Sequence, residues 1–254
     1  MQFLRSLFFA VGMWLATLVI APIGLLTFPL RFEHRYAVIT QWARFNLWWL
    51  RLCCGLGFRV NGREYIPDSN AIIFCKHQST WETLALQQIF PPQIWVLKRE
   101  LLRIPLFGWG LAMLEPIAID RGSGRKALRQ LVAEGEQRLH AGRWVVVFPE
   151  GTRVAPGTTR PYGIGGAVLA SRSGYPVVPV AHNAGEYWPR KGFVKRPGTI
   201  QVEIGPPIPT EGKSSEEINR AVGEWMEATM EKISQCQNSI GNDDRSYNSG
   251  SPSG

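Results

Sequence analysis

Residues 72–86 read IIFCKHQSTWETLAL, which is a short apolar run followed by a polar loop and the beginning of a helix. A short apolar run that stops at such a loop is typical of a strand buried on both faces. His77 stands just past this strand, and Glu82 follows five residues later near the start of the helix. On one regular helix these side chains would point about 140° apart. They can therefore meet only if His77 lies in the loop.

The types of these two residues suggest acid–base chemistry. A carboxylate at Glu82 can accept a hydrogen bond from one ring nitrogen of His77 and leave the other nitrogen free as a base toward a hydroxyl. A histidine and a glutamate at this spacing are also common where a solvated helix begins. The pair therefore predicts a site only in combination with other motifs.

A second motif, FPEGTR at residues 148–153, follows the apolar run WVVV. This order places Glu150 and Arg153 at the carboxyl end of a strand, where open α/β sheets bind ligands. Arg153 is suited to hold a phosphate through two parallel hydrogen bonds. The alternative is a plain Pro-Glu-Gly turn that carries an exposed arginine.

The chain after Gly62 alternates apolar runs with helical segments, which predicts an α/β fold. Because most of the runs are uniformly apolar, we expect a mixed, largely parallel central sheet covered by helices on both faces. The predicted strands are residues 71–75, 94–97, 116–119, 144–148, 177–180 and 200–204. A covering helix is predicted at residues 125–140. A capping box of Ser214 and Glu217 opens a last helix. The predicted apolar face of that helix is Ile218, Val222, Trp225, Thr229 and Ile233.

The N-terminal stretch SLFFAVGMWLATLVIAPIGLLTFPL, residues 6–30, has no charged residue and is long enough to cross a hydrocarbon core of about 30 Å. A second apolar, aromatic stretch follows at residues 40–58. One interpretation is a single span. The preferred one is a hairpin whose second helix lies in the membrane interface. A buried pair of soluble helices is the third.

In the hairpin interpretation, Trp42, Trp48 and Trp49 lie at headgroup depth, and Arg44 and Arg51 reach lipid phosphate. The positive-inside tendency then places the catalytic domain on the cytoplasmic side, with a bacterial inner membrane as the expected location. The basic residues that support this orientation are Arg5, Arg31, Arg35 and Arg44.

The formal charge of +8 favours an anionic partner. Because the chain has no helix-turn-helix, zinc-finger or RNP-like pattern, we expect a membrane lipid rather than nucleic acid. The four cysteines form no C-x-x-C pair, and no metal site is predicted. Cys75 is interpreted as a small buried hydrophobe. His34, His140 and His182 are interpreted as structural or surface residues.

Four blocks, in this order and at these distances, resemble those of the glycerolipid acyltransferase family, and of bacterial 1-acylglycerol-3-phosphate acyltransferases in particular. The blocks are KHQSTWE, EPIAIDR, FPEGTR and VVPVA, within residues 71–181. The resemblance implies that His77 is the catalytic histidine and that Glu82 is its acidic partner. The family pattern is usually H-x4-D, so Glu82 is a departure. The implied substrate-binding residues are Lys98, Arg121, Glu150, Gly151, Thr152 and Arg153.

The implied reaction moves an acyl group from acyl-CoA or acyl-carrier protein to the hydroxyl of lysophosphatidic acid, which gives phosphatidic acid. No metal or further cofactor is expected. Another lysophospholipid or an amino-acid-linked lysolipid is the alternative acceptor, and a non-catalytic membrane lipid-binding protein is the alternative function. The expected organisation is a membrane-anchoring segment at residues 1–58, an acyltransferase domain at 59–237 and a disordered tail at 238–254.

Overall fold

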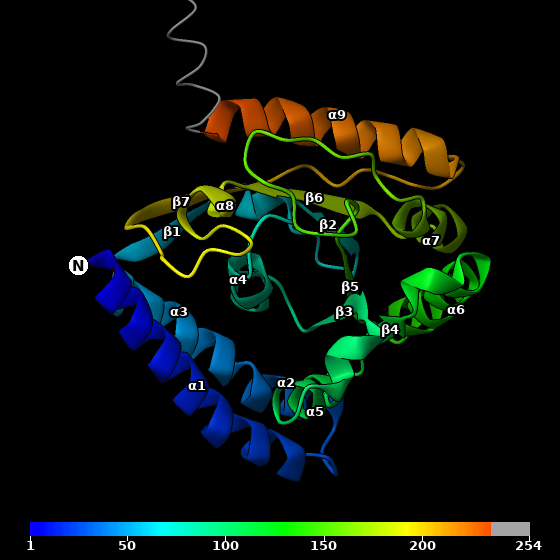
Figure 1. The fold of residues 1–254 in the computed structure, drawn as a ribbon. Coiled ribbons are helices and arrows are strands. Elements are labelled where there is room, and N and C mark those ends of the chain that lie inside the picture. Colours follow the sequence, from blue (N-terminus) through cyan, green and yellow to red (C-terminus); the bar gives the residue numbers. More distant parts are fainter. Residues whose placement is uncertain (235–254) are drawn as a thin grey trace, which may run out of the picture.

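A central sheet organises residues 1–234, which are the residues that the computed structural model describes, except for the Arg121 side chain (Figure 1). Within them the sheet has seven strands in the order β1-β7-β6-β2-β5-β3-β4. The strands are β1 (Leu56–Asn61), β2 (Ile72–Cys75), β3 (Gln93–Lys98), β4 (Ile117–Ile119), β5 (Trp144–Val147), β6 (Val177–His182) and β7 (Gly198–Ile204). Neighbouring strands are parallel except for β6 and β7. The predicted mixed, largely parallel sheet is confirmed.

Helices cover both faces of this sheet (Figure 1). The α-helices are α1 (Gln2–Leu26), α2 (Phe32–Ile39), α3 (Gln41–Cys54), α4 (Trp81–Ile89), α5 (Phe107–Ala112), α6 (Arg125–His140), α7 (Gly165–Ser173), α8 (Ala184–Tyr187) and α9 (Ser215–Ile233). Three 3-10 turns are η1 (Arg63–Tyr65), η2 (Arg99–Arg103) and η3 (Arg121–Ser123). Helices α1, α3 and α4 lie on one side of the sheet, and α7 and α9 lie on the other, with α6 near the β4 edge. Helix α2 packs through Phe32 and Tyr36 in the cluster that includes α6, α7 and α9.

The central strand β2 explains why its sequence is apolar throughout. Successive side chains of a strand point to opposite faces. Ile73 and Cys75 pack in the hydrophobic cluster that includes α3 and α4, whereas Ile72 and Phe74 pack in the cluster that includes α6, α7 and α9. All four residues are fully buried. The strand therefore ends in a rigid, doubly covered position, and its carboxyl end leads directly to His77.

The six predicted strands are present with bounds that shift by at most two residues. Strand β1 was not predicted, because residues 40–58 were interpreted as one helical stretch. That prediction is wrong at its end: Gly55 takes a left-handed conformation (φ +65°) and closes α3, and the chain then enters β1. Strand β1 pairs with β7 in parallel. The expected division at residue 58 consequently falls inside a strand.

Two helices follow the sequence patterns closely. Helix α6 has the predicted bounds, and Ser214 and Glu217 form the predicted capping box of α9. The apolar face of α9 is rotated from the predicted one, because its buried residues repeat every four positions. These buried residues are Ile218, Val222, Met226 and Met230. Trp225, Thr229 and Ile233 are only partly buried. The predicted tail at 238–254 lies outside the described residues.

The N-terminal helices form a hairpin in which α1 packs along α3 (Figure 1). Their contact is close because small residues of α1 face α3. A Cβ atom built on Gly12 would lie 2.0 Å from Trp49 Nε1. Trp49 donates a hydrogen bond to the Phe8 carbonyl, and Trp42 donates one to Thr17 Oγ1. The indole N–H groups of Trp42 and Trp49 thus face α1, and their depth in a membrane stays a prediction.

The outer face of α1 is strongly apolar. Within the described residues, α1 is the one helix long and apolar enough to cross a membrane by length and composition, with a mean hydropathy of 2.2. Its exposed large side chains are Phe3, Leu4, Leu7, Phe8, Val11, Trp14, Leu15, Leu18, Val19, Ile23 and Leu26. Helix α3, with 14 residues, is shorter than the roughly 20 residues that a span requires. The structure thus matches a hairpin with one long apolar helix.

We expect Gly12→Leu to destabilise the protein, because a leucine at this position has no space against Trp49. Overpacking of this kind costs about 1–3 kcal/mol of unfolding free energy. The measurement is the melting temperature in detergent. Gly57→Leu is the matched control, since no atom lies within 4 Å of a Cβ built there. Equal melting temperatures of the two variants would contradict the packing described here.

Candidate active site

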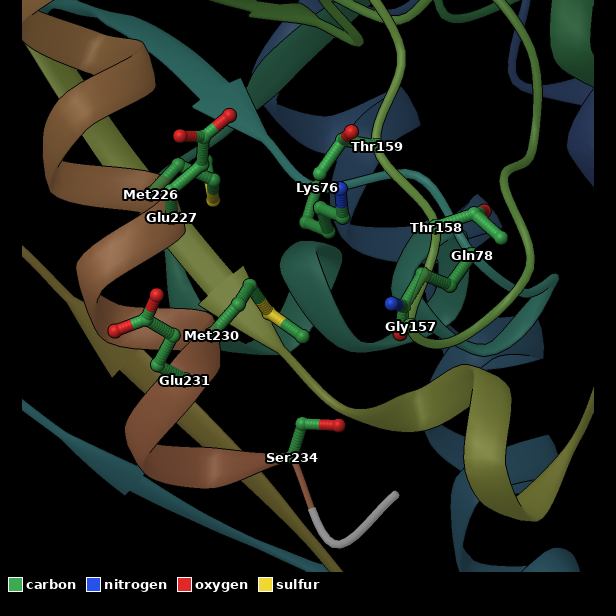
Figure 2. Close-up of a pocket in the computed structure, with 10 residues that line it drawn as sticks. All are labelled: Lys76, Gln78, Gly157, Thr158, Thr159, Met226, Glu227, Met230, Glu231 and Ser234. Atoms are coloured by element: carbon green, nitrogen blue, oxygen red, sulfur yellow. The ribbon is translucent and has the colours of Figure 1, made fainter. Parts of the chain in front are cut away.

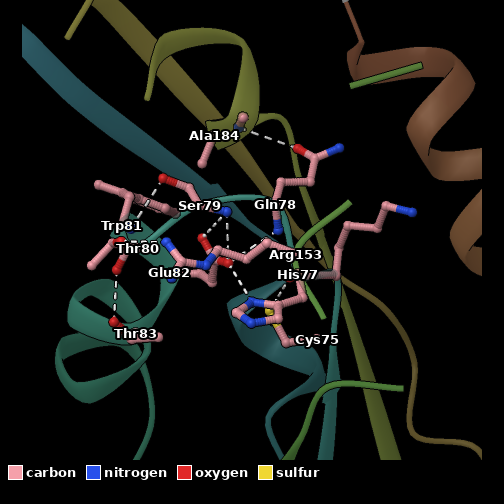
Figure 3. A network of polar contacts seen from close by, with 12 residues as sticks. Cys75, His77, Gln78, Ser79, Thr80, Trp81, Glu82, Thr83, Arg153 and Ala184 are labelled. Carbon is pink, nitrogen blue, oxygen red and sulfur yellow. Dashed lines mark hydrogen bonds and ion pairs between the residues drawn. The ribbon is translucent and has the colours of Figure 1, made fainter. Parts of the chain in front are cut away.

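His77 lies in the loop between β2 and α4, as the spacing required, and its ring meets Glu82 in the first turn of α4 (Figure 3). The distance from His77 Nδ1 to Glu82 Oε1 is 2.8 Å. The His77 ring also stacks on Phe148, with 3.9 Å between the ring centroids. Its side chain is 15% exposed. The ring is therefore oriented from two sides and still accessible.

Glu82 is buried and organises the whole loop. Its carboxylate accepts hydrogen bonds from the backbone N–H groups of Gln78 at 3.1 Å and Ser79 at 2.9 Å. Burial acts to raise the pKa of Glu82, but the interactions with His182 and His77 and the bond from Ser79 outweigh it and hold the pKa below its ordinary value. An ionised Glu82 fixes the proton of His77 on Nδ1. The Nε2 atom is then left as the basic nitrogen.

The FPEGTR loop, after β5, supports His77 from behind. Glu150 Oε2 accepts the backbone N–H of His77 at 2.9 Å, and the backbone N–H of Val154 donates to the His77 carbonyl at 2.7 Å. Gly151 has φ +67°, a conformation that favours glycine and turns the loop toward Arg153. Glu150 Oε1 lies 2.6 Å from Lys76 Nζ, and the Glu150 side chain is 0% exposed. The predicted contact between Glu150 and substrate does not fit this placement.

A cavity of about 570 Å³ opens in front of His77. Its polar end is lined by His77, Thr80, Lys98, Gly151, Thr152, Arg153 and Arg190. Its apolar part runs toward the N-terminal hairpin and α5, and is lined by Ile20, Ala21, Trp42, Leu97, Phe107, Gly110 and Leu111 among others. The cavity can therefore hold an amphiphilic molecule with its polar group beside His77 and its apolar part against the hairpin.

Three basic residues surround the polar end. Arg153 Nη1 donates to Thr80 Oγ1 at 2.8 Å and to the Arg190 carbonyl at 3.4 Å, and Arg190 Nη1 donates back to the Arg153 carbonyl at 3.2 Å. Lys98 stands at the end of β3. Among the described residues, none of the three forms an ion pair. Their positive charges are thus available to an anionic ligand.

The second block of the resemblance, EPIAIDR, ends at the short turn after β4. Asp120 accepts hydrogen bonds from the Gly122 N–H and the Ser123 hydroxyl, so it caps the short turn after β4. Arg121 begins this turn, and its side chain is outside the description. Asp120 is not among the described residues that line the cavity. The predicted role of Arg121 stays a prediction.

Two residues of the site, Lys76 and Arg190, were not predicted from the sequence. Lys76 and Arg190 carry no spacing signal that separates them from other surface basic residues. His182, interpreted as structural or surface, is fully buried behind Glu82, with its Nε2 2.8 Å from the Lys76 carbonyl and its Nδ1 accepting the Ala184 N–H. Burial lowers the pKa of His182 and keeps it neutral. This confirms a structural placement for His182.

The cysteine beside the site behaves as predicted. Cys75 is fully buried, and burial raises the pKa of its thiol. Within the described part of the chain, no group of three or more His, Cys, Asp or Glu side chains is placed to hold a metal ion.

Comparisons with known proteins place this site in a family. The family model described as "Acyltransferase" matches residues 57–183. The 1-acyl-sn-glycerol-3-phosphate acyltransferase of Pseudomonas aeruginosa is 46% identical over 87% of this chain and 85% of its own. The protein of that name from Saccharomyces cerevisiae is 30% identical over 80% of this chain and 68% of its own.

A solved structure agrees in fold. The 1-acyl-sn-glycerophosphate acyltransferase of Thermotoga maritima has a TM-score of 0.75, with 24% identity over 92% of this chain and 98% of its own. The family match begins within β1 and ends just after β6, so it contains His77, Glu82 and the FPEGTR loop. The chain is therefore an enzyme that belongs to the acyltransferase family.

Proposed function

We propose that this enzyme transfers an acyl group from an acyl thioester to the free hydroxyl of a 1-acylglycerol 3-phosphate, with His77 as the general base. The observation that carries the proposal is the position of the His77–Glu82 pair, which stands where a cationic opening meets an apolar cavity. The names of the relatives support the acceptor, because the proteins from Pseudomonas aeruginosa and yeast both act on this class of lipid by their names.

The proposed reaction needs no protein nucleophile. His77 Nε2 removes the proton of the acceptor hydroxyl as the oxygen attacks the thioester carbonyl. The carbon–sulfur bond then breaks, and the thiolate that leaves takes the proton from the imidazolium of His77. Glu82 stabilises the imidazolium while it exists, since its ionised carboxylate touches Nδ1. Acyl-CoA and acyl-carrier protein are both donors of the required chemistry.

The cationic opening supports a phosphate monoester in particular. Lys98, Arg153 and Arg190 supply three positive charges that form no ion pair among the described residues. A phosphate monoester carries close to two negative charges at neutral pH. A phosphodiester lysolipid carries one negative charge and adds a bulky headgroup. The site therefore favours lysophosphatidic acid over other lysophospholipids.

The apolar surfaces support action at a bilayer. The exposed face of α1 presents aromatic and aliphatic side chains, and the cavity is lined in part by the same helix. Insertion of α1 into the membrane would let a lipid acceptor reach the cavity without crossing water. We propose that the catalytic domain faces the cytoplasm, where the donors are made.

Alanine at Arg153, Lys98 or Arg190 is expected to lower kcat/KM for lysophosphatidic acid by about 10-fold to 100-fold, chiefly through the KM of the acceptor. This range corresponds to the loss of one charged hydrogen bond to phosphate, about 1.5–3 kcal/mol. The KM of the acyl donor is the internal control. A rise in the donor KM alone would show that the cations hold the donor instead.

The acceptor is tested with a panel of lysolipids and labelled acyl thioesters, presented to the protein in membranes. We expect transfer to the phosphomonoester lysolipid, and weaker transfer to phosphodiester or amino-acid-linked lysolipids. Preferred transfer to a phosphodiester lysolipid would replace the proposed acceptor and leave the reaction type intact. Failure with every acceptor would favour a non-catalytic lipid-binding protein.

A further inference from the structure

A buried ion pair lies directly behind the His77 loop. Lys76 Nζ is 2.6 Å from Glu150 Oε1, and the side chains are only 7% and 0% exposed. Fully buried lysine and glutamate side chains are rare unless they are paired. Lys76 immediately precedes His77 in the chain, whereas Glu150 comes from the FPEGTR loop. The pair therefore joins the two loops that build the site.

Glu150 uses its two oxygens for different tasks. Oε1 faces the Lys76 ammonium group, and Oε2 accepts the backbone N–H of His77. The His77 carbonyl is held by the Val154 N–H of the same FPEGTR loop. The His77 backbone is thus fixed on both sides by this loop, while Glu82 fixes the ring. A displacement of Glu150 would shift the ring relative to the cavity.

The pair does not touch the substrate cavity. Neither Lys76 nor Glu150 is among the residues that line it. Lys76 instead borders a separate cavity of about 220 Å³ between the loop and α9, where Figure 2 shows it across from Met226 and Met230. An effect of the pair on the reaction must therefore pass through His77.

The positive charge of Lys76 and the negative charge of Glu150 balance each other. Either charge alone would be buried without a counter-charge. Burial raises the pKa of Glu150, and the Lys76 ammonium group acts in the opposite direction. Without the Glu150 charge, a buried ammonium group would stand beside an imidazole that must become positive during proton transfer. Breaking a buried ion pair by removing one partner is strongly destabilising, whereas replacing both partners by neutral groups is often tolerated.

The other titratable groups near the pair are neutral, exposed or already bonded to other groups. Burial raises the pKa of the Cys75 thiol and of the Tyr162 hydroxyl, so both are neutral. Glu227 and Glu231 of α9 border the small cavity with Lys76, and both are exposed. Glu82 is already bonded to the His77 ring and to the Gln78 N–H, and burial lowers the pKa of the neighbouring His182.

We propose that Lys76 and Glu150 act as one unit that positions His77 and balances the charge behind it, so that a neutral pair can replace the charged pair but neither partner can be neutralised alone. This inference rests on the proposed role of His77 as the general base. It assigns Lys76 a role and changes that of Glu150 from a substrate contact to a positioning residue.

The test compares Lys76→Met, Glu150→Gln and the double variant Lys76→Met/Glu150→Gln. The methionine approximates the volume of lysine, and the amide oxygen that Glu150→Gln introduces can still accept the His77 N–H. We expect each single variant to lower kcat per folded protein by about 10-fold to 100-fold, as for a misplacement of about 1 Å, with both KM values nearly unchanged. The double variant is expected to recover to within a few-fold of the parent.

The pH profile gives a readout that fold stability alone does not move. In Glu150→Gln, the unbalanced Lys76 ammonium disfavours the imidazolium of His77, so the acid limb of kcat/KM moves to lower pH. The double variant is expected to restore the limb. If a single variant does not fold, the double variant still decides the question, since an inactive but folded double variant would overturn the proposal.

Two further results would overturn the proposed role of the Lys76–Glu150 pair. Single variants with unchanged kcat and pH profile but lower melting temperatures would reduce the pair to a structural role. A double variant as impaired as the single variants would show that balanced charge is not what matters. His77→Ala is measured in the same experiment. Activity of His77→Ala at the parental level would refute the role of His77 as the base. That outcome differs from unchanged activity in the Lys76 and Glu150 variants, which would refute only the role of the pair.

Discussion

Replacing His77 with alanine is expected to lower kcat by about 10³-fold, which lies within the range that a positioned general base contributes. His77 Nδ1 is held by Glu82, and the ring borders the cavity, so no other described base lies at the same place. The variant should still fold, because the His77 backbone bonds to Glu150 and Val154 do not involve the ring. The measurement is the initial rate of acyl transfer at saturating donor and acceptor.

The matched control for this loss is His182→Gln. His182 lies behind Glu82 and does not line the cavity, and its neutral ring serves the Lys76 carbonyl and the Ala184 N–H. We expect His182→Gln to lower the stability of the protein more than it lowers the rate of acyl transfer per folded molecule. If His77→Ala kept a rate within tenfold of the parent, the assignment of the base would be wrong.

The second large effect is expected for Glu82→Gln, which should lower kcat by about 10²-fold or more. The amide can donate to His77 Nδ1 and so stabilise the tautomer whose proton is on Nε2, which removes the basic nitrogen from the cavity. It also removes the negative charge that stabilises the imidazolium. Glu82→Asp restores the charge with one methylene less, so we expect an intermediate rate.

The pH dependence of stability follows from the lowered pKa of Glu82. A carboxyl group whose folded-state pKa lies below its ordinary value, 4.5 for this group, stabilises the fold above that value. This contribution is lost as the pH falls through the folded-state pKa. Glu82→Gln should therefore be less sensitive to acid than the parent. Denaturant unfolding of both proteins between neutral and acidic pH checks this, and an unchanged acid sensitivity would contradict the lowered pKa.

The sequence was sufficient for the central part of the site. A uniformly apolar β2 and a polar loop placed His77 at a strand end, and the five-residue spacing then required His77 to lie in the loop for Glu82 to reach it. The structure has this arrangement. FPEGTR was also placed correctly after β5, because the apolar run before it ends at the same edge of the sheet.

The contacts that depend on tertiary structure were not predictable. Spacing says nothing about Lys76 and Glu150, which are far apart in the chain and meet only because β2 and β5 pair in parallel. Arg190 reaches the cavity through a loop after α8. The sequence predicts a substrate contact for Glu150 and no role for Lys76 or Arg190, whereas the structure buries Lys76 and Glu150 and places Arg190 in the cavity lining.

In the N-terminal region, hydropathy alone does not predict the contacts of the aromatic side chains or the start of β1. Trp42 and Trp49 suggested an aromatic belt, yet each donates its N–H to α1 and helps to close the hairpin. Strand β1 was hidden because its apolar start continues that of α3, and the left-handed Gly55 is a weak signal by itself. The direction of the Trp42 and Trp49 N–H groups and the backbone conformation of Gly55 depend on tertiary structure, which composition does not reveal.

The role of His77 as the general base is tested with the purified protein in lipid bilayers that contain lysophosphatidic acid and a labelled acyl thioester. The formation of labelled phosphatidic acid is followed over time. We expect steady product formation by the parent protein and about 10³-fold slower formation by His77→Ala at equal folded concentration. Labelled phosphatidic acid formed by His77→Ala at the parental rate would contradict the claim that His77 deprotonates the acceptor.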